Sequence, residues 1–227
     1  MKSTTEQLTQ LFLFSFDQNR FWALKQMGIG PSQLKEVKGL RFYKFLGTGA
    51  GNGFSLRPDF STYALLLVWD SPAMAASFLQ HQTYLDYYQR STKVRCLTLR
   101  NFQSHGKWSG SNPFLSIGGT VEKDQTVAII TRATLRFSRL FSFWRHVPQA
   151  AKAIETAAGV QYFKGIGEWP FIQQATISIW NSLDDVMQFA YRHKAHASIV
   201  KKTRQKKWYA EDLFARFIIQ NDTQLKA

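Results

Sequence analysis

An internal repeat constrains the fold of this chain more than any other feature of its sequence. The matching residues keep the same order in both halves, and aromatic residues surround each copy. In the first half they are Gly39, Lys44, Gly47, Trp69, Ser71 and Phe78, and their counterparts are Gly159, Lys164, Gly167, Trp180, Ser182 and Phe189. Ordered self-similarity of this kind indicates one structural unit that is present twice.

Each copy has the same predicted order of elements: strand, helix, two strands, helix, strand. A glycine ends the first helix of each copy, and a serine begins the second helix. The expected elements span 8–16, 20–28, 39–47, 62–70, a helix from 71 and 94–102 in the first half, and 126–135, 138–157, 159–167, 173–181, 182–204 and 213–220 in the second. This order is that of the ferredoxin-like unit.

A single ferredoxin-like sheet carries helices on one face, so its other face must be covered. Two copies in one chain can cover these faces mutually. We therefore expect an α+β fold in which two tandem ferredoxin-like βαββαβ halves, residues 1–104 and 125–227, form a pseudo-dimeric α/β barrel. Residues 105–124 form the linker, which is rich in turn residues and is expected to follow the surface. The interior of such a barrel is where we expect an apolar ligand.

Residues 47–58 make the two halves unequal, because the matching segment of the second half is shorter. Glycines alternate in this loop, so it matches neither the dinucleotide fingerprint nor the P-loop. The loop can be a longer connection without a function of its own. Alternatively, its glycines let the backbone approach a bulky ligand, or act as the hinge of a lid.

The chain carries 29 Lys and Arg residues against 15 Asp and Glu, a formal net charge of +14, which favours an anionic partner. Nucleic acid and an anionic membrane surface are both such partners, and the absent aromatic pattern of RNA-recognition sheets argues against RNA. The longest apolar run, Tyr63 to Trp69, is too short to span a bilayer. With Cys96 as the single cysteine and no visible secretion signal, we expect a cytoplasmic protein.

Histidines are the candidate metal ligands. His193 and His196 lie three residues apart on the helix predicted for 182–204, close to its apolar stripe, whereas the other histidines are isolated. A neutral imidazole on an inward face can bind haem iron axially, but it can equally be a hydrogen-bonded core residue. Periodicity places His193 nearer the middle of the stripe.

Several blocks along nearly the whole chain resemble the spheroidene monooxygenase family, which oxygenates acyclic carotenoids. The blocks are QMG at 26–28, GLRFYK at 39–44, GTGAGNGF at 47–54, RP at 57–58, WSG at 108–110, PF at 113–114, TRATL at 131–135, KGIGEWP at 164–170, AHA at 195–197, WY at 208–209 and EDLFARF at 211–217. The blocks occur in order, and several of them are distinctive.

This resemblance implies a haem-dependent monooxygenase that adds hydroxyl and then oxo groups near C-2 of an acyclic carotenoid, with electrons from a reduced ferredoxin. It implies His196, in the AHA block, as the axial iron ligand, whereas periodicity alone favours His193. Arg57 is the candidate catalytic residue on the distal side, although on sequence alone it can equally be a solvated arginine. Trp169 and Lys164 become candidates for cofactor contacts.

A membrane-dissolved substrate fits a peripheral position on the inner membrane and favours a membrane surface over nucleic acid, and the sequence leaves the oligomeric state open. The alternatives are a non-catalytic binder of haem or another apolar ligand on the same fold, and an oxygenase of another terpenoid.

Overall fold

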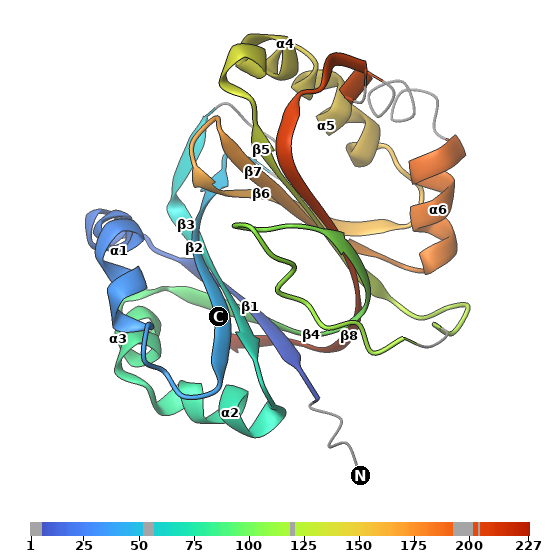
Figure 1. Ribbon diagram of the computed structural model, residues 1–227. Coiled ribbons are helices and arrows are strands. Elements are labelled where there is room, and N and C mark those ends of the chain that lie inside the picture. Colours follow the sequence, from blue (N-terminus) through green and yellow to red (C-terminus); the bar gives the residue numbers. More distant parts are fainter. Residues whose placement is uncertain (1–5, 52–56, 119–120, 193–201, 204) are drawn as a thin grey trace.

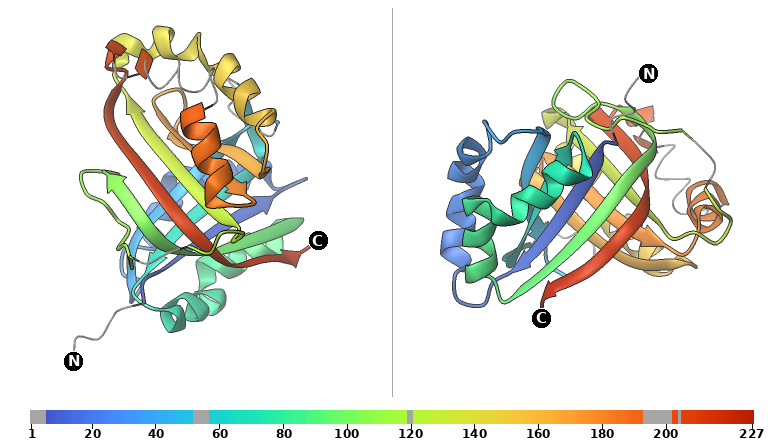
Figure 2. Two further views of the ribbon diagram at one scale, coloured as in Figure 1. Left: turned by 90° about the vertical axis from the view of Figure 1, so that its right-hand side faces the viewer. Right: turned by 90° about the horizontal axis from the view of Figure 1, so that it is seen from below.

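The computed structural model describes residues 6–51, 57–118, 121–192, 202–203 and 205–227, and its strands close into a single barrel (Figure 1). Around the barrel the strands follow the order β1-β3-β2-β6-β7-β5-β8-β4, and all neighbouring pairs are antiparallel. The helices of the two halves lie on opposite outer sides of the barrel (Figure 2). The predicted fold of two ferredoxin-like halves in one α+β barrel is confirmed.

The first half follows the predicted order, but its second helix is divided. Its elements are β1 (Leu8–Ser15), α1 (Arg20–Gln33), β2 (Leu40–Gly49), β3 (Pro58–Trp69), α2 (Pro72–Ser77), the short 3-10 turn η1 (Phe78–Gln80), α3 (Gln82–Arg90) and β4 (Lys93–Gly106). The Ser71 hydroxyl accepts a hydrogen bond from the backbone N–H of Met74, as expected for the cap of α2. The Nδ1 atom of His81 caps α3 in the same way, by accepting from Thr83, so this histidine has a structural position.

The second half repeats the pattern with its first helix divided. Its elements are β5 (Val127–Leu135), the 3-10 turn η2 (Phe137–Arg139), α4 (Leu140–Trp144), α5 (Val147–Glu155), β6 (Val160–Trp169), β7 (Gln173–Trp180), α6 (Leu183–Arg192) and β8 (Tyr209–Lys226). The sequence predicts one continuous helix over 138–157, whereas the chain turns at Arg145 and His146 between α4 and α5. Ser182 caps α6 by accepting from the N–H of Asp185. No helix of the described segments is long and apolar enough to cross a membrane.

Two seams join the halves, and they differ in length. At one seam β4 and β8 pair from Val94 and Lys226 through to Gly106 and Leu213. At the other seam the described register between β2 and β6 consists of Gly47 with Gly167 and Thr48 with Ile166. The barrel is therefore closed by a long strand pairing along one side and by a short strand pairing along the other.

The barrel interior is packed with side chains, which corrects the expectation of an apolar ligand there. Aliphatic residues from all eight strands fill it, among them Leu66, Leu97 and Ile177, each with no exposed surface. The linker contributes as well, because Trp108 and Phe114 are both buried in this cluster. The linker thus does not simply follow the surface; it closes one end of the barrel. Protein interiors packed at this density leave no space for a large ligand.

Candidate functional site

The outer faces of the two half-sheets, which lie under the helices, differ sharply although the backbone repeats. In the first half one cross-strand row consists of Phe45, Leu65 and Phe12. The corresponding row of the second half consists of Gly165, Thr176 and Thr131. In the next row, Tyr63 pairs with Phe14, and their counterparts are Gln174 and Ala133. Large side chains of the first sheet are thus replaced by small or polar ones.

These substitutions change how helices pack on the sheet. In the first half a single apolar cluster, rich in aromatic rings, joins the sheet to α1, α2 and α3. In the second half the described apolar residues form two separate clusters, one around Trp180 and Val186 and one around Phe143 and Trp208. Between them lies a stretch of sheet that we call the floor, which consists of Thr131, Ala133, Gly165, Gln174, Thr176 and Ser178.

A polar atom of the floor lacks a partner. The Thr176 side chain is 5% exposed, and its hydroxyl makes no hydrogen bond in the described part of the chain. The neighbouring Ser178 hydroxyl accepts from the Trp180 indole at 2.9 Å. A buried hydroxyl without a partner costs about 1–3 kcal/mol, and the Tyr63 hydroxyl of the first half is unpartnered in the same way.

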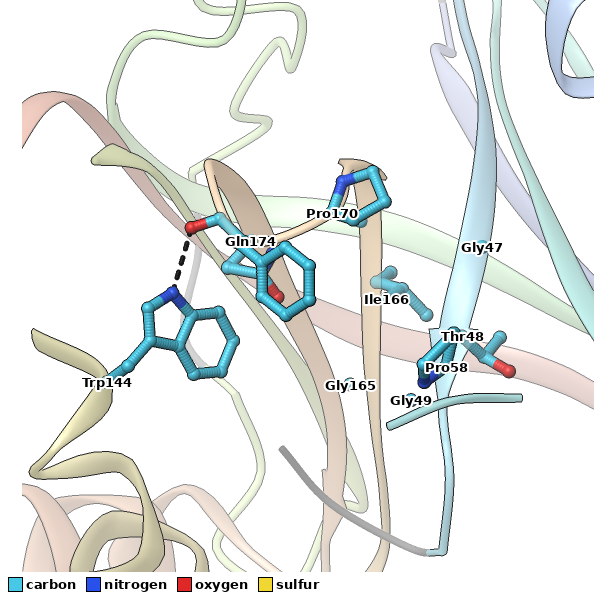
Figure 3. A pocket seen from close by; sticks show the side chains of 11 residues that line it. Gly47, Thr48, Gly49, Pro58, Trp144, Gly165, Ile166, Pro170 and Gln174 are labelled. Carbon is cyan, nitrogen blue, oxygen red and sulfur yellow. Dashed lines mark hydrogen bonds between the residues drawn. The ribbon is translucent and has the colours of Figure 1, made fainter. Parts of the chain in front are cut away.

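A pocket of about 270 Å³ opens beside the floor (Figure 3). Its lining comes from the inserted loop and its flanks, from β6, from the β6–β7 turn and from α4: Gly47, Thr48, Gly49, Pro58, Trp144, Gly165, Ile166, Gly167, Pro170, Phe171 and Gln174. The Trp144 indole N–H donates to the carbonyl oxygen of Phe171 at 3.0 Å, and the two rings meet edge to face. Helix α4 and the β6–β7 turn are thereby held together on one side of the pocket.

The apolar lining and the glycines of β2 and β6 suit a flat or elongated hydrocarbon group. Glycine allows backbone to approach such a group closely. At Gly167 a Cβ atom would come within 2.6 Å of the carbonyl oxygen of Gln173, so the turn itself requires glycine at this position. The Thr48 hydroxyl donates a hydrogen bond to the carbonyl oxygen of Thr62 at 2.9 Å, so its methyl group is what remains for the pocket.

The two predicted iron ligands, His193 and His196, lie outside the described residues. Arg57 is exposed on the loop, directly before the pocket residue Pro58, and its carbonyl oxygen accepts from the Ala50 N–H. Trp169 is 65% exposed at the end of β6, next to the pocket residue Pro170. Their proposed roles stay predictions. Among the described residues, no group of three or more His, Cys, Asp or Glu side chains is arranged to hold a metal.

Lys164 lies on the barrel side of β6, opposite the floor. Its ammonium group donates to the carbonyl oxygen of Gly51 at 2.8 Å and lies 3.4 Å from an oxygen of Asp59. Burial acts to raise the pKa of Asp59, but hydrogen bonds from Ser61 and the charge of Lys164 outweigh it, so the pKa is lowered. Lys164 therefore ties the second half to the inserted loop, and a cofactor contact stays a prediction.

A network of half-buried charges around the buried Arg132, near the linker, was not foreseen from the sequence. Glu168 accepts from the Lys44 ammonium at 2.5 Å and from the Trp108 indole at 2.6 Å, and it lies 3.8 Å from the Arg132 guanidinium. Arg132 also pairs with Glu211. The recurrence of Lys44 and the WSG and KGIGEWP blocks were signals for it, but their spacing could not show that they meet.

Glu211 fastens the linker to this network. Its carboxylate accepts from the backbone N–H groups of Ser109 at 3.0 Å and Gly110 at 2.8 Å. Burial acts to raise its pKa, but these two hydrogen bonds and the charge of Arg132 lower it below the ordinary value. The two cations and two carboxylates balance, so the network is suited to holding the barrel end together.

The fold defines the chain as a tandem ferredoxin-like barrel with an apolar pocket where the flanks of the inserted loop, β6, the β6–β7 turn and α4 meet. Two solved structures of aldoxime dehydratase, one of them in complex with butyraldoxime, share this fold. Their TM-scores are 0.61 and 0.60, at 11% identity, with 97% and 96% of this chain and 83% and 81% of theirs covered. No family model matches the sequence.

Curated relatives narrow the class. The chain is 32% identical to spheroidene monooxygenase of Rubrivivax gelatinosus over 88% of its own length and 76% of that protein. It is 28% identical to the enzyme of Rhodobacter capsulatus, covering 92% of this chain and 89% of the relative, and 30% identical to that of Cereibacter sphaeroides, covering 92% and 65%. These relatives identify it as an oxidoreductase. The chain belongs to the spheroidene monooxygenase family.

Proposed function

We propose that this protein is a haem-dependent monooxygenase that adds hydroxyl and then oxo groups near C-2 of acyclic carotenoids of the spheroidene type. Family membership supports the reaction class and the carotenoid substrate. The observation that carries the proposal within the structure is the small-residue floor with its adjoining apolar pocket. A hydrocarbon chain end needs an apolar, concave site with few polar groups.

The described residues fit a flat, largely apolar cofactor on the floor. The side chains there are small where the first half carries large ones, and the unpartnered Thr176 hydroxyl offers a donor. The side chain that binds the iron would be His196, with His193 as the alternative. Trp169 and Lys164 remain candidates for further contacts with the cofactor. When bound, haem supplies the oxygen-activating chemistry.

The residues of this chain would bind and orient the substrate. Trp144, Pro170 and Phe171 would provide apolar contacts for the chain end and exclude water from it. The side-chain amide of Gln174 is a polar group of the lining that can fix an oxygenated end group after the first reaction. Arg57, which precedes the pocket residue Pro58, would supply a cation near the mouth of the pocket. Holding the chain end in one position determines which carbon reacts.

Electrons would come from a reduced ferredoxin-type donor. The substrate is a long hydrocarbon that dissolves in membranes, so a cytoplasmic enzyme must meet it at the inner membrane. The net charge of +14 favours contact with anionic lipid there.

Two measurements test the proposal. Protein produced with a haem supply should show a Soret band that is lost in His196→Ala and kept in the matched control His193→Ala. The reverse pattern would make His193 the ligand, and no haem uptake by the wild type would overturn the haem assignment.

Product analysis in cells that make lycopene or neurosporene tests the reaction itself. Oxygenated carotenoids are expected with the wild-type protein and absent with His196→Ala. Unchanged pigment alongside haem uptake would instead indicate a non-catalytic binder or an oxygenase of another terpenoid.

A further inference from the structure

Two phenylalanines of the second half are exposed where apolar side chains are ordinarily buried. Phe137 in η2 and Phe141 in α4 have 81% and 82% of their surface accessible. They are four residues apart, so they lie on the same face of this short helical segment. The opposite face packs inward through Phe143 and Leu140. An exposed aromatic pair on a rigid element is a common mark of an interaction site.

All charged side chains close to this pair in the sequence are positive. No acidic residue occurs between Asp124 and Glu155, whereas Arg136, Arg139 and Arg145 are all exposed within it. In the described part of the chain none of these three arginines is in an ion pair. Aromatic side chains beside basic ones match the interfacial region of an anionic bilayer, where rings enter the headgroup layer and cations meet phosphate.

More cationic side chains lie next to the same helix, in the segment just before β8. Lys206 and Lys207 are exposed and directly precede Trp208. The Trp208 indole donates to the Ser142 hydroxyl of α4 at 3.1 Å, and its ring packs edge to face on Phe143. The two lysines are thereby anchored next to α4, and they extend its positive surface.

The pocket opens between this segment and the β6–β7 turn. Trp144, the last residue of α4, lines the pocket and is bonded to Phe171 of the turn. The turn exposes further aromatic surface, since Trp169 is 65% and Phe171 45% accessible. Exposed aromatic residues therefore lie on both elements that border the pocket.

We propose that Phe137, Phe141 and Trp169, together with Arg139 and Arg145, form a docking surface for anionic lipid bilayers. Docking there would place the pocket mouth against the membrane, so that a hydrocarbon chain end could enter without crossing water. The purpose of the surface rests on the proposed function, but lipid binding itself does not.

Vesicle flotation tests the docking surface directly. The wild-type protein should bind vesicles of phosphatidylglycerol and phosphatidylcholine and should bind pure phosphatidylcholine far less. Phe137→Ser combined with Phe141→Ser should weaken binding to the anionic vesicles about tenfold or more, because both rings lose their apolar contacts. Arg139→Gln combined with Arg145→Gln should weaken binding and flatten its dependence on salt.

Tyr191→Ser is the matched control, because Tyr191 is a 69% exposed aromatic residue on α6 and carries no part of the docking surface. It should bind vesicles as the wild type does, and circular dichroism should show all variants folded. Wild-type binding by the phenylalanine variant, or no binding by the wild type, overturns the proposal. A dimer that the phenylalanine substitutions convert to monomer, without vesicle binding, would instead make this surface a contact between copies.

Failure of docking and failure of the enzymatic proposal can be told apart. Turnover of a detergent-dispersed carotenoid should be the same in the wild type and the phenylalanine variant, whereas turnover of vesicle-embedded carotenoid should fall in the variant. An active wild type that ignores vesicles would refute docking alone. Vesicle binding by a protein that oxygenates no carotenoid would refute the enzymatic proposal alone.

Discussion

The two halves of the barrel have the same backbone arrangement, but they fill the space between sheet and helices differently. The first half fills it with stacked aromatic rings such as Phe12, Phe14 and Tyr87. The second half places Thr131 and Ala133 where the first has Phe12 and Phe14. The comparison teaches that a duplicated unit can keep its fold while one copy gives up large side chains between sheet and helices, at the place where we propose the binding site.

The largest expected effect comes from giving the floor a large side chain that the first half has at the corresponding position. Ala133→Phe places at Ala133 the side chain that its counterpart Phe14 has. The ring would occupy the floor, so activity and cofactor uptake should fall to background while the protein stays folded. Carotenoid product analysis and the Soret band measure both. The matched control is Ala210→Phe, at an exposed position of β8; retained activity in Ala133→Phe would remove the floor from the site.

The reverse change tests the stabilising role of the first half. Phe14→Ala removes a fully buried ring that packs against Tyr84 and Tyr87. The free energy of unfolding should fall by about 3–5 kcal/mol, the usual cost of such a cavity. Urea denaturation followed by circular dichroism measures it. A loss below 1 kcal/mol would mean that the first interface is not the better packed one.

A smaller effect separates the two buried threonines. Thr176→Val removes a hydroxyl that has no partner, so the ligand-free protein should be unchanged or more stable by about 1 kcal/mol. Thr48→Val is the matched control, because its hydroxyl donates to Thr62, and it should cost about 1 kcal/mol. Thermal unfolding of both variants gives the sign. Equal destabilisation would show that the Thr176 hydroxyl has a partner.

The smallest effect concerns Glu211, which pairs with Arg132 and binds the linker. The pKa of Glu211 is lower in the folded protein than its ordinary value of 4.5, so its contribution to stability is complete above pH 4.5 and is lost as the pH falls through the folded pKa. Glu211→Gln should therefore be less stable than the wild type at neutral pH, and the difference should shrink in acid. Thermal unfolding at several pH values measures it, and parallel curves would contradict the prediction.

Much of the fold could be predicted because the repeat and the caps are local signals. Ser71 and Ser182 begin helices where the sequence predicts them, and the strand order follows from the repeat. The division of the helix predicted over 138–157 was missed although it has a local signal: Pro148 lies in the first turn of α5, and a proline in a helix interior removes a hydrogen bond and clashes with the preceding turn. The role of the linker was missed because a buried Trp108 among turn residues has no periodic pattern to reveal it.

The site was predicted only in part. The barrel interior, where the ligand was expected, is filled by side chains, because periodicity shows which strand residues are apolar but not which face encloses space. The aligned repeat did contain the better signal, in the replacement of Phe45 by Gly165 and of Leu65 by Thr176. Reading it requires the register between strands, which the three-dimensional structure supplies. Ion pairs such as that of Lys44 with Glu168 join distant segments, and one sequence cannot show such pairs.

The long seam between β4 and β8 has a consequence for biosynthesis. Strand β4 belongs to the first half, yet the edge that it presents from Val94 to Gly106 is covered only by β8, which the ribosome makes after all the other described strands. Until then β4 of the nascent chain is an edge strand with unpaired backbone N–H and C=O groups. Neighbouring chains can pair with such an edge and aggregate. Translation speed and chaperone supply should therefore govern the yield of folded protein more strongly than the stability of the finished barrel does.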